Sequence, residues 1–140
     1  MEIAGTPVAA IGPGLLVLVG VERDDDSHCA ARLAERLLAY RVFADSEGRM
    51  NRSVADLGGE LLLVPQFTLA ADTTRGTRAG FSTAAEPAKG QALFDELVRA
   101  CRERGTSVAT GQFGAQMQVT LTNDGPVTFW LRAAPRAASV

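Results

Sequence analysis

The longest apolar run of the chain, Leu15–Val21, is the feature that most constrains its fold. An uninterrupted run of this kind, preceded by the turn residues Gly12-Pro13-Gly14, is typical of a β-strand buried on both faces. The run is too short to cross a bilayer, which takes about 20 residues of helix. Other elements must therefore cover this strand within a globular core.

Two amphipathic helices are predicted around this strand. The first begins near His28, because Asp24-Asp25-Asp26-Ser27 offers N-cap residues and apolar side chains then follow at helical spacing, namely Cys29, Leu33, Leu37 and Tyr40. The second begins at Glu86-Pro87 and ends at Gly105, since proline is favoured in a first helical turn and glycine after a last one.

Several short strands are also predicted, mostly as hairpins. They are Glu2–Ala4 with Val8–Ile11, then Arg41–Phe43, Glu60–Leu69, and Met117–Leu121 with Val127–Leu131. Pro65 removes a ladder donor, so it marks an edge, a bulge or an interruption of the sheet for a ligand. Hairpins in place of regular βαβ units favour an α+β fold, with the two main helices against a curved, mixed or antiparallel sheet of barrel-like form.

The composition is that of one globular domain. The 140 residues are 46% hydrophobic and 21% charged, which gives a sizeable core and argues against disorder. We expect a single domain over residues 1–132. A disordered tail is expected at 133–140, where small and apolar residues follow no pattern.

Charge and cysteine content indicate the environment. Fourteen basic and sixteen acidic side chains give a formal charge of -2, so any contact with RNA must come from a local patch. Cys29 and Cys101 fall within the predicted helices, where free thiols are usually core residues. No targeting segment or membrane span is expected, and the sequence indicates a cytoplasmic protein.

The inventory of catalytic side chains is poor. His28 is the only histidine, and its place at a helix start behind three aspartates indicates a solvated residue. Helix capping explains these aspartates better than binding of a hard cation. The sequence has no nucleophile elbow, phosphate-binding loop or dinucleotide fingerprint, and its cysteines lack metal-site spacing, so no metal or cofactor is expected. An enzyme with this inventory must act on an already reactive bond or use chemistry supplied by its substrate.

Two short motifs carry most of the functional information. Gln66-Phe67-Thr68-Leu69 closes one predicted strand, and Asn123-Asp124-Gly125-Pro126-Val127-Thr128 forms a predicted turn. Together they resemble the two signatures of the D-aminoacyl-tRNA deacylase family of bacterial type, a Ser-Gln-Phe-Thr-Leu strand and an Asn-x-Gly-Pro-x-Thr turn. The resemblance covers nearly the whole chain, from Ile11 to Thr128.

The resemblance implies a homodimer that hydrolyses the ester bond of D-aminoacyl-tRNA, an ester activated by its own α-ammonium group. It implies that the Gly125–Pro126 peptide is cis and enters the active site of the partner subunit, where its carbonyl groups hold the substrate's α-amino group. An L side chain would collide with this backbone, whereas D-aminoacyl groups and glycine, as on Gly-tRNA(Ala), would fit. Selection would then be steric rejection of the L form.

The resemblance also implies roles for the remaining motif residues. Phe67 would donate its main-chain N–H to the developing oxyanion, Gln66 would shape the pocket wall, and Thr68 would orient the substrate through its hydroxyl group. Met117 would line the same pocket, although a core methionine explains this residue equally well. Asn123 and Thr128 would support the turn.

Residues 70–83 show no periodicity, and a loop of this length in a compact domain is often functional. The loop carries Arg75 and Arg78 and is the best place for a local basic patch. By resemblance the two arginines would contact the acceptor end of tRNA, and the alternative is that they are ordinary solvated side chains.

The chain departs from the family pattern in two places. Pro65 stands where the family has serine, which removes a hydroxyl group and a backbone donor beside the pocket. Family members also carry a further first strand, with an arginine near the active site, before the segment that begins here at Met1; a misassigned start codon is the expected explanation.

Two alternatives remain open at this point. The chain could be a non-catalytic RNA-binding or oligomer-forming module on the same scaffold. It could also edit L-alanyl-tRNA, since its Pro-Gln opening is similar to that of an animal relative with this activity; that reading predicts a trans Gly125–Pro126 bond.

Overall fold

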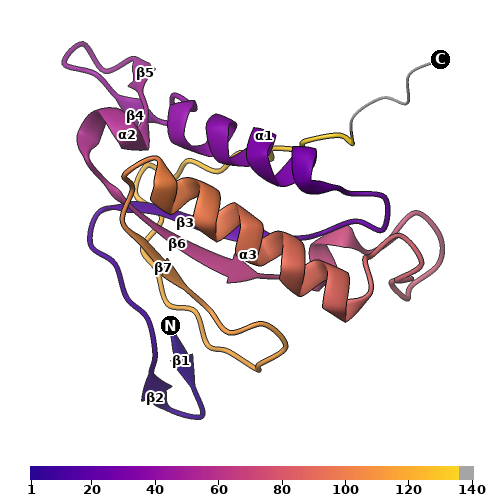
Figure 1. Cartoon of the computed structure of the whole chain (residues 1–140). Helices are drawn as coiled ribbons and strands as arrows, with labels where there is room; N and C mark the ends of the chain where they lie inside the picture. The colour runs from indigo at the N-terminus through magenta and orange to yellow at the C-terminus, as the bar shows by residue number, and fades with distance from the viewer. Residues whose placement is uncertain (136–140) are drawn as a thin grey trace, which may run out of the picture.

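The computed structural model describes residues 1–135 and shows a mixed α/β fold (Figure 1). The helices of this part are α1 (Ser27–Ala39), α2 (Val54–Leu57) and α3 (Pro87–Glu103), with the 3-10 helix η1 (Phe67–Ala70). The strands are β1 (Glu2–Ile3), β2 (Thr6–Pro7), β3 (Gly14–Val19), β4 (Phe43–Ala44), β5 (Met50–Arg52), β6 (Glu60–Pro65) and β7 (Val108–Thr110). The predicted main helices are confirmed as α1 and α3. The tail prediction for residues 136–140 lies outside the described residues.

The central sheet is parallel, with β6 between β3 and β7. Leu62 lies opposite Leu16 on one side and opposite Ala109 on the other. α1 lies in the connection from β3 to β6, and α3 in that from β6 to β7. The predicted hairpin organisation is therefore wrong for this sheet. Continuous apolar runs such as 15–19 and 61–64 are the pattern of parallel strands joined by helical crossovers.

The core lies between this sheet and the two long helices, which pack together on one of its faces (Figure 1). Ala34 of α1, Leu61 and Leu63 of β6, and Cys101 of α3 are each 0% exposed. Leu61 and Leu63 lie on the same side of β6 because alternate residues of a strand share a face. These contacts fix both helices on β6.

The strand buried on both faces is β6, not β3 as predicted. Leu62 and Val64, on the face of β6 away from the helices, are buried as well. Leu18 of β3 is 45% exposed. The reason is that β3 is an edge strand of the sheet, so fewer elements cover it.

Local sequence explains where the helices begin. Asp26 caps α1 by accepting a hydrogen bond from the Cys29 N–H at 3.0 Å, which confirms the capping interpretation for this aspartate, whereas Asp25 accepts from the Glu22 N–H before the helix. Ser53 and Asp56 form a reciprocal capping box at the start of α2. Pro87 occupies the first turn of α3, where its missing N–H costs no intrahelical bond.

The strand predicted over Glu60–Leu69 ends at Pro65, and the second half of that prediction is wrong. Pro65 occupies the last position of the ladder with β3. The main chain then turns, because the Leu69 N–H donates to the Gln66 carbonyl and the Ala71 N–H to the Thr68 carbonyl. The motif residues after Gln66 therefore form η1 in place of a strand.

The two terminal segments pair less than predicted. The N-terminal hairpin is shorter, since Glu2 and Ile3 pair with Pro7 and Thr6 and not with residues 8–11. The strand predicted over Arg41–Phe43 lies further along the chain, as β4 (Phe43–Ala44), which pairs with β5. The hairpin predicted at 117–131 is not formed within the described residues, where this segment contributes only the isolated bridge between Gln118 and Glu2.

A groove of about 1140 Å³ runs along β3, between this strand and residues 120–124 and 127–133. β3 pairs with β6 alone, so its other edge has no ladder partner in the described part of the chain. The sheets formed by residues 1–135 are not closed. The barrel-like form is therefore not confirmed.

Gly14 is predicted to be essential for seating β3 on β6. A Cβ atom at Gly14 would lie 1.9 Å from the main-chain oxygen of Glu60, whereas one at Gly12 would lie 3.6 Å from a side-chain oxygen of the same residue. Gly14→Ala should lower the free energy of unfolding by about 3 kcal/mol, as overpacking against backbone does. Urea unfolding measures this loss, and Gly12→Ala is the matched control. Equal stability of the two variants would contradict the prediction.

Candidate active site

The start of η1 is held against the end of β3. The Gln66 N–H donates to the Val19 carbonyl at 2.7 Å, so the motif begins directly after the ladder between β3 and β6. Gly20 allows the close approach: a Cβ atom there would lie 2.9 Å from the Leu69 Cβ and 3.3 Å from the Gln66 carbonyl oxygen. Sequence reasoning treated Gly20 as part of an apolar run, and its function as a spacer became visible only in three dimensions.

Gln66 and Thr68 form one polar unit on the surface of η1. The Gln66 Nε2 donates to the Thr68 Oγ1 at 2.5 Å. Because the hydroxyl oxygen accepts this bond, its own hydrogen is available for another acceptor. Phe67 is the first residue of η1, where an N–H has no partner within a helix. Phe67 and Thr68 are both exposed residues, so the hydroxyl donor of Thr68 stands next in sequence to the Phe67 N–H at the start of η1.

The Asn123–Thr128 turn is organised by the Asn123 side chain. Its Oδ1 accepts from the Val127 N–H at 3.1 Å, and its Nδ2 donates to the Thr128 Oγ1 at 2.9 Å. The Gly125–Pro126 peptide bond is cis, the form that the resemblance implies. Gly125 has a φ of +133°, and a Cβ atom there would lie 2.8 Å from the Val127 Cγ2. Only glycine fits this conformation without strain.

The turn and η1 are separate within one chain. No hydrogen bond among the described residues joins Gly125 or Pro126 to Gln66, Phe67 or Thr68. Gly125 and Pro126 are exposed, as are Phe67 and Thr68. The single chain therefore presents the two motifs as separate exposed segments.

Met117 lies close to Gly111 and Pro65. A Cβ atom at Gly111 would be 2.8 Å from the Met117 Sδ and 3.3 Å from the Pro65 Cδ. Met117 therefore packs over Gly111 beside the proline that precedes Gln66. The side chain of Met117 is half-buried.

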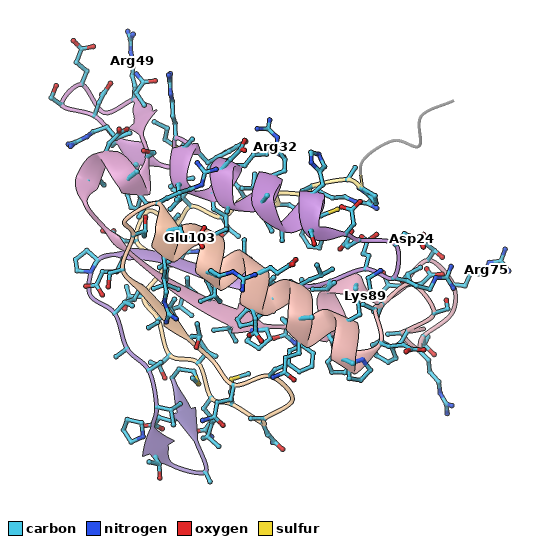
Figure 2. All side chains as sticks on the ribbon, in the orientation of Figure 1. Asp24, Arg32, Arg49, Arg75, Lys89 and Glu103 are labelled. Atoms are coloured by element: carbon cyan, nitrogen blue, oxygen red, sulfur yellow. The ribbon has the colours of Figure 1, made fainter. Side chains whose placement is uncertain are left out.

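The loop after η1 is a closed structure. The Asp72 N–H donates to the Gly80 carbonyl at 2.7 Å, and the Gly80 N–H returns a bond to the Asp72 carbonyl at 2.9 Å. Hydrogen bonds from Thr74 lower the pKa of the Asp72 carboxyl group. Arg75 extends outward from this loop (Figure 2). Neither Arg75 nor Arg78 forms an ion pair within residues 1–135.

Other reactive groups have structural explanations. His28 is exposed at the start of α1. Burial raises the pKa of Cys29 and of Cys101 to about 11, so both remain thiols at neutral pH. Among the described residues, no three His, Cys, Asp or Glu side chains are grouped so as to hold a metal ion. No helix in this part of the chain has the length and apolarity to span a membrane.

Known proteins are similar to this chain in sequence and in fold. A D-aminoacyl-tRNA deacylase of Alkalilimnicola ehrlichii is 61% identical over 138 residues, which are 99% of this chain and 92% of that protein. A solved structure described as a c-Myc DNA unwinding element binding protein has a TM-score of 0.89 and 32% identity, covering 95% of this chain and 91% of the other.

A second solved structure, of a probable eukaryotic D-amino acid tRNA deacylase, has a TM-score of 0.67 and covers 76% of this chain and 77% of the other. Its identity is 18%, so it supports the fold alone. The model of the family described as D-Tyr-tRNA(Tyr) deacylase matches residues 1–132. This match, with the relative that is 61% identical over nearly its full length, shows that the chain belongs to the D-Tyr-tRNA(Tyr) deacylase family.

Proposed function

We propose that this chain hydrolyses the ester bond of D-aminoacyl-tRNA and releases free tRNA and the D-amino acid. The observation that supports the proposal is the polar unit of η1, in which Gln66 donates to the Thr68 hydroxyl and the adjacent Phe67 N–H, at the first position of the helix, has no partner within it. The family of the chain and the names of its relatives agree with this activity. No metal or cofactor enters the proposed reaction.

The proposed chemistry uses main-chain donors and groups of the substrate. The ester carbonyl oxygen accepts from the Phe67 N–H, while the Thr68 hydroxyl, held by Gln66, orients the ester. The substrate's ammonium group activates the carbonyl carbon, and its ribose hydroxyl assists attack by water. A C–O bond forms from water, the bond to the ribose oxygen breaks, and that oxygen takes up a proton. One preorganised donor contributes a factor of about 10² to 10³ in rate.

Selection for the D form is proposed to need a homodimer. The Gly125–Pro126 turn of one subunit would complete the site at η1 of the other, and its carbonyl groups would hold the substrate's α-amino group. This arrangement would explain why both segments are exposed in the single chain. Asn123 and Thr128 would hold the turn rigid, so an L side chain would clash while D-aminoacyl groups and Gly-tRNA(Ala) would enter.

Arg75 and Arg78 are proposed to contact phosphates near the aminoacylated end of tRNA. Both are exposed on a loop that follows η1 directly, and neither has an acidic partner in the part of the chain that the structure describes. Since the formal charge of the chain is -2, attraction to RNA must be local. The protein would act in the cytoplasm, in quality control of translation, as a single domain of residues 1–132.

A non-catalytic nucleic-acid-binding module is the second candidate. It is favoured by the 32% identical structure whose description names DNA binding. The two candidates differ in what they require of η1, because a binding module would not need the hydrogen bond between Gln66 and Thr68. The third reading, editing of L-alanyl-tRNA, has Pro65 in place of serine in its favour, but it predicts a trans Gly125–Pro126 bond, whereas this bond is cis.

The first prediction for this function is release of D-tyrosine from D-Tyr-tRNA and of glycine from Gly-tRNA(Ala), with L-Tyr-tRNA and L-Ala-tRNA left intact. A backbone that rejects L side chains by steric clash leaves room for any aminoacyl group without an L side chain. Glycine should therefore be released from its tRNA as D-amino acids are. Single-turnover hydrolysis of the four radiolabelled substrates tests this directly. Hydrolysis of L-Ala-tRNA would favour the editing reading, and tRNA binding without hydrolysis would favour the binding module.

Gly125→Ala is predicted to lower the rate of D-Tyr-tRNA hydrolysis by about 10²-fold, the effect expected when a positioning group moves by an ångström. The added Cβ would meet the Val127 side chain at 2.8 Å and would strain a backbone with φ of +133°. Gly105→Ala is the matched control, because Gly105 also has positive φ, at +86°, but has open space around its Cβ position. An equal loss of rate in both variants would assign the effect to strain alone.

Thr68→Val is predicted to lower kcat by only about tenfold, the value of one hydrogen bond of about 1.4 kcal/mol. Valine keeps the shape of threonine and removes its hydroxyl group, so the variant tests an orienting role. Gln66→Leu should have an effect of similar size and should add little to Thr68→Val, since the two side chains form one unit. Complete loss of activity, with a covalent ester trapped on the wild-type Thr68, would instead establish a nucleophile.

A further inference from the structure

The Gly125–Pro126 turn lies in a part of the chain that is attached to the rest through side chains. Within residues 1–135, no hydrogen bond between two main-chain groups involves a residue after Gln118. The turn itself is closed by the Asn123 side chain, whose hydrogen bonds go to residues of the same turn. The position of the turn relative to the sheet therefore depends on side-chain contacts of the segments that flank it.

Two residues of α1 contact the segment that follows the turn. Arg36 donates from its Nη1 to the Arg132 carbonyl at 3.0 Å. Its guanidinium carbon also lies 5.8 Å from the centroid of the Tyr40 ring, and that ring forms a tilted pair with Phe129 at 5.6 Å. Arg36 and Tyr40 are four residues apart, so they lie on the same side of the helix. α1 thus holds the segment at residue 129 and at residue 132.

An ion pair ties the same segment to the loop between β3 and α1. The Arg132 Nη2 donates to the Glu22 Oε2 at 2.8 Å, and the two residues are 110 positions apart in the sequence. The main chain of Glu22 is itself fixed, because its N–H donates to the Asp25 carboxylate at 2.8 Å. This loop begins at Gly20, on which η1 is seated. The ion pair therefore links the segment after the turn to the support of the other motif.

Apolar packing holds this segment only in part. Phe129 is 49% exposed and Trp130 is 73% exposed. Leu131 is half-buried and packs against the core. One apolar side chain in the core fixes a point of the segment and leaves its direction free. The polar contacts at Arg132 supply the second point that a direction requires.

We propose that the ion pair between Glu22 and Arg132 is a clamp that sets the position of the Gly125–Pro126 turn, an inference that rests on the proposed function. In that function the turn holds the substrate's α-amino group, so a displaced turn slows hydrolysis of the D substrate. Arg36 supports the clamp by binding the main chain of the same segment. The clamp residues touch no reacting atom, so they are positioning residues.

The test compares Glu22→Gln, Arg132→Gln and a double variant with the two charges exchanged, Glu22→Arg with Arg132→Glu. Each single variant should lower kcat for D-Tyr-tRNA by about 3- to 5-fold, the upper range for an exposed ion pair. KM should stay unchanged, because the residues proposed to contact tRNA lie on another loop. The exchanged variant restores the attraction and should return kcat to within about twofold of the wild type.

A second measurement does not depend on activity. The Val127 N–H donates to the Asn123 Oδ1 within the turn, so its amide exchange, followed by NMR, reports how often the turn opens. Exchange at Val127 should be about 3- to 5-fold faster in each single variant. It should return to the wild-type rate in the exchanged variant.

Arg32→Gln is the matched control. Arg32 forms an ion pair with Glu35 on α1 at 2.9 Å, and both side chains are exposed, so the same substitution removes a similar contact elsewhere. Its kcat and its exchange rate at Val127 should equal those of the wild type. Thermal unfolding of all variants separates a displaced turn from lost folding.

Direct binding of RNA by Arg132 would give a different pattern. Loss of a phosphate-binding cation raises KM, and loss of a nearby carboxylate lowers it, so Arg132→Gln and Glu22→Gln would have opposite effects. The clamp requires the two variants to have the same effect. Opposite effects on KM, or a loss of kcat that the charge exchange does not restore, would therefore overturn the clamp.

The clamp and the proposed function fail separately. If the wild type hydrolyses D-Tyr-tRNA while the single variants keep its kcat, the clamp is overturned and the proposed function stands, whatever the exchange rate at Val127. If the wild type hydrolyses no D-aminoacyl-tRNA, the proposed function is overturned. Exchange at Val127 then decides the clamp alone: faster exchange in both single variants with recovery in the exchanged variant supports it, and unchanged exchange overturns it.

Discussion

The parallel pairing of β3 with β6 is the interaction on which the candidate site depends. The ladder ends where Val19 faces Pro65, and the next bond, from the Gln66 N–H to the Val19 carbonyl, already belongs to the site. Two glycines make this geometry possible, Gly14 at the beginning of the ladder and Gly20 just after its end. The site is thus an extension of the sheet, and its position follows from the register of two strands.

The chemistry follows from how little the side chains offer. With an exposed histidine and two thiols of high pKa, the chain has few groups for acid–base or nucleophilic work at neutral pH. Donors from the main chain and one oriented hydroxyl suffice if the substrate is an activated ester. Such a site depends on backbone geometry, which explains why glycine and proline stand at so many of its positions.

The sequence predicted the helices well and the sheet poorly, for physical reasons. Caps and helical spacing are local signals, and Asp26 and Pro87 act as their types indicate. Strand pairing depends on residues far apart in sequence, so the apolar runs could not reveal that β3 and β6 are parallel. Pro65 signalled a break in the strand, and β6 ends there, whereas the seat of η1 on Gly20 required three-dimensional contacts. The motif residues were found through family resemblance, since their types alone carry little information.

The groove along β3 has a consequence for spectroscopy. Trp130 is the only tryptophan of the chain, lines this groove and is 73% exposed. Indole emission shifts to shorter wavelength when water is removed from the ring, so the chain carries one intrinsic fluorophore in this groove. Assembly, an added strand or a detergent that covers the groove therefore shifts the emission of Trp130 to shorter wavelength. This shift can be measured without any added label.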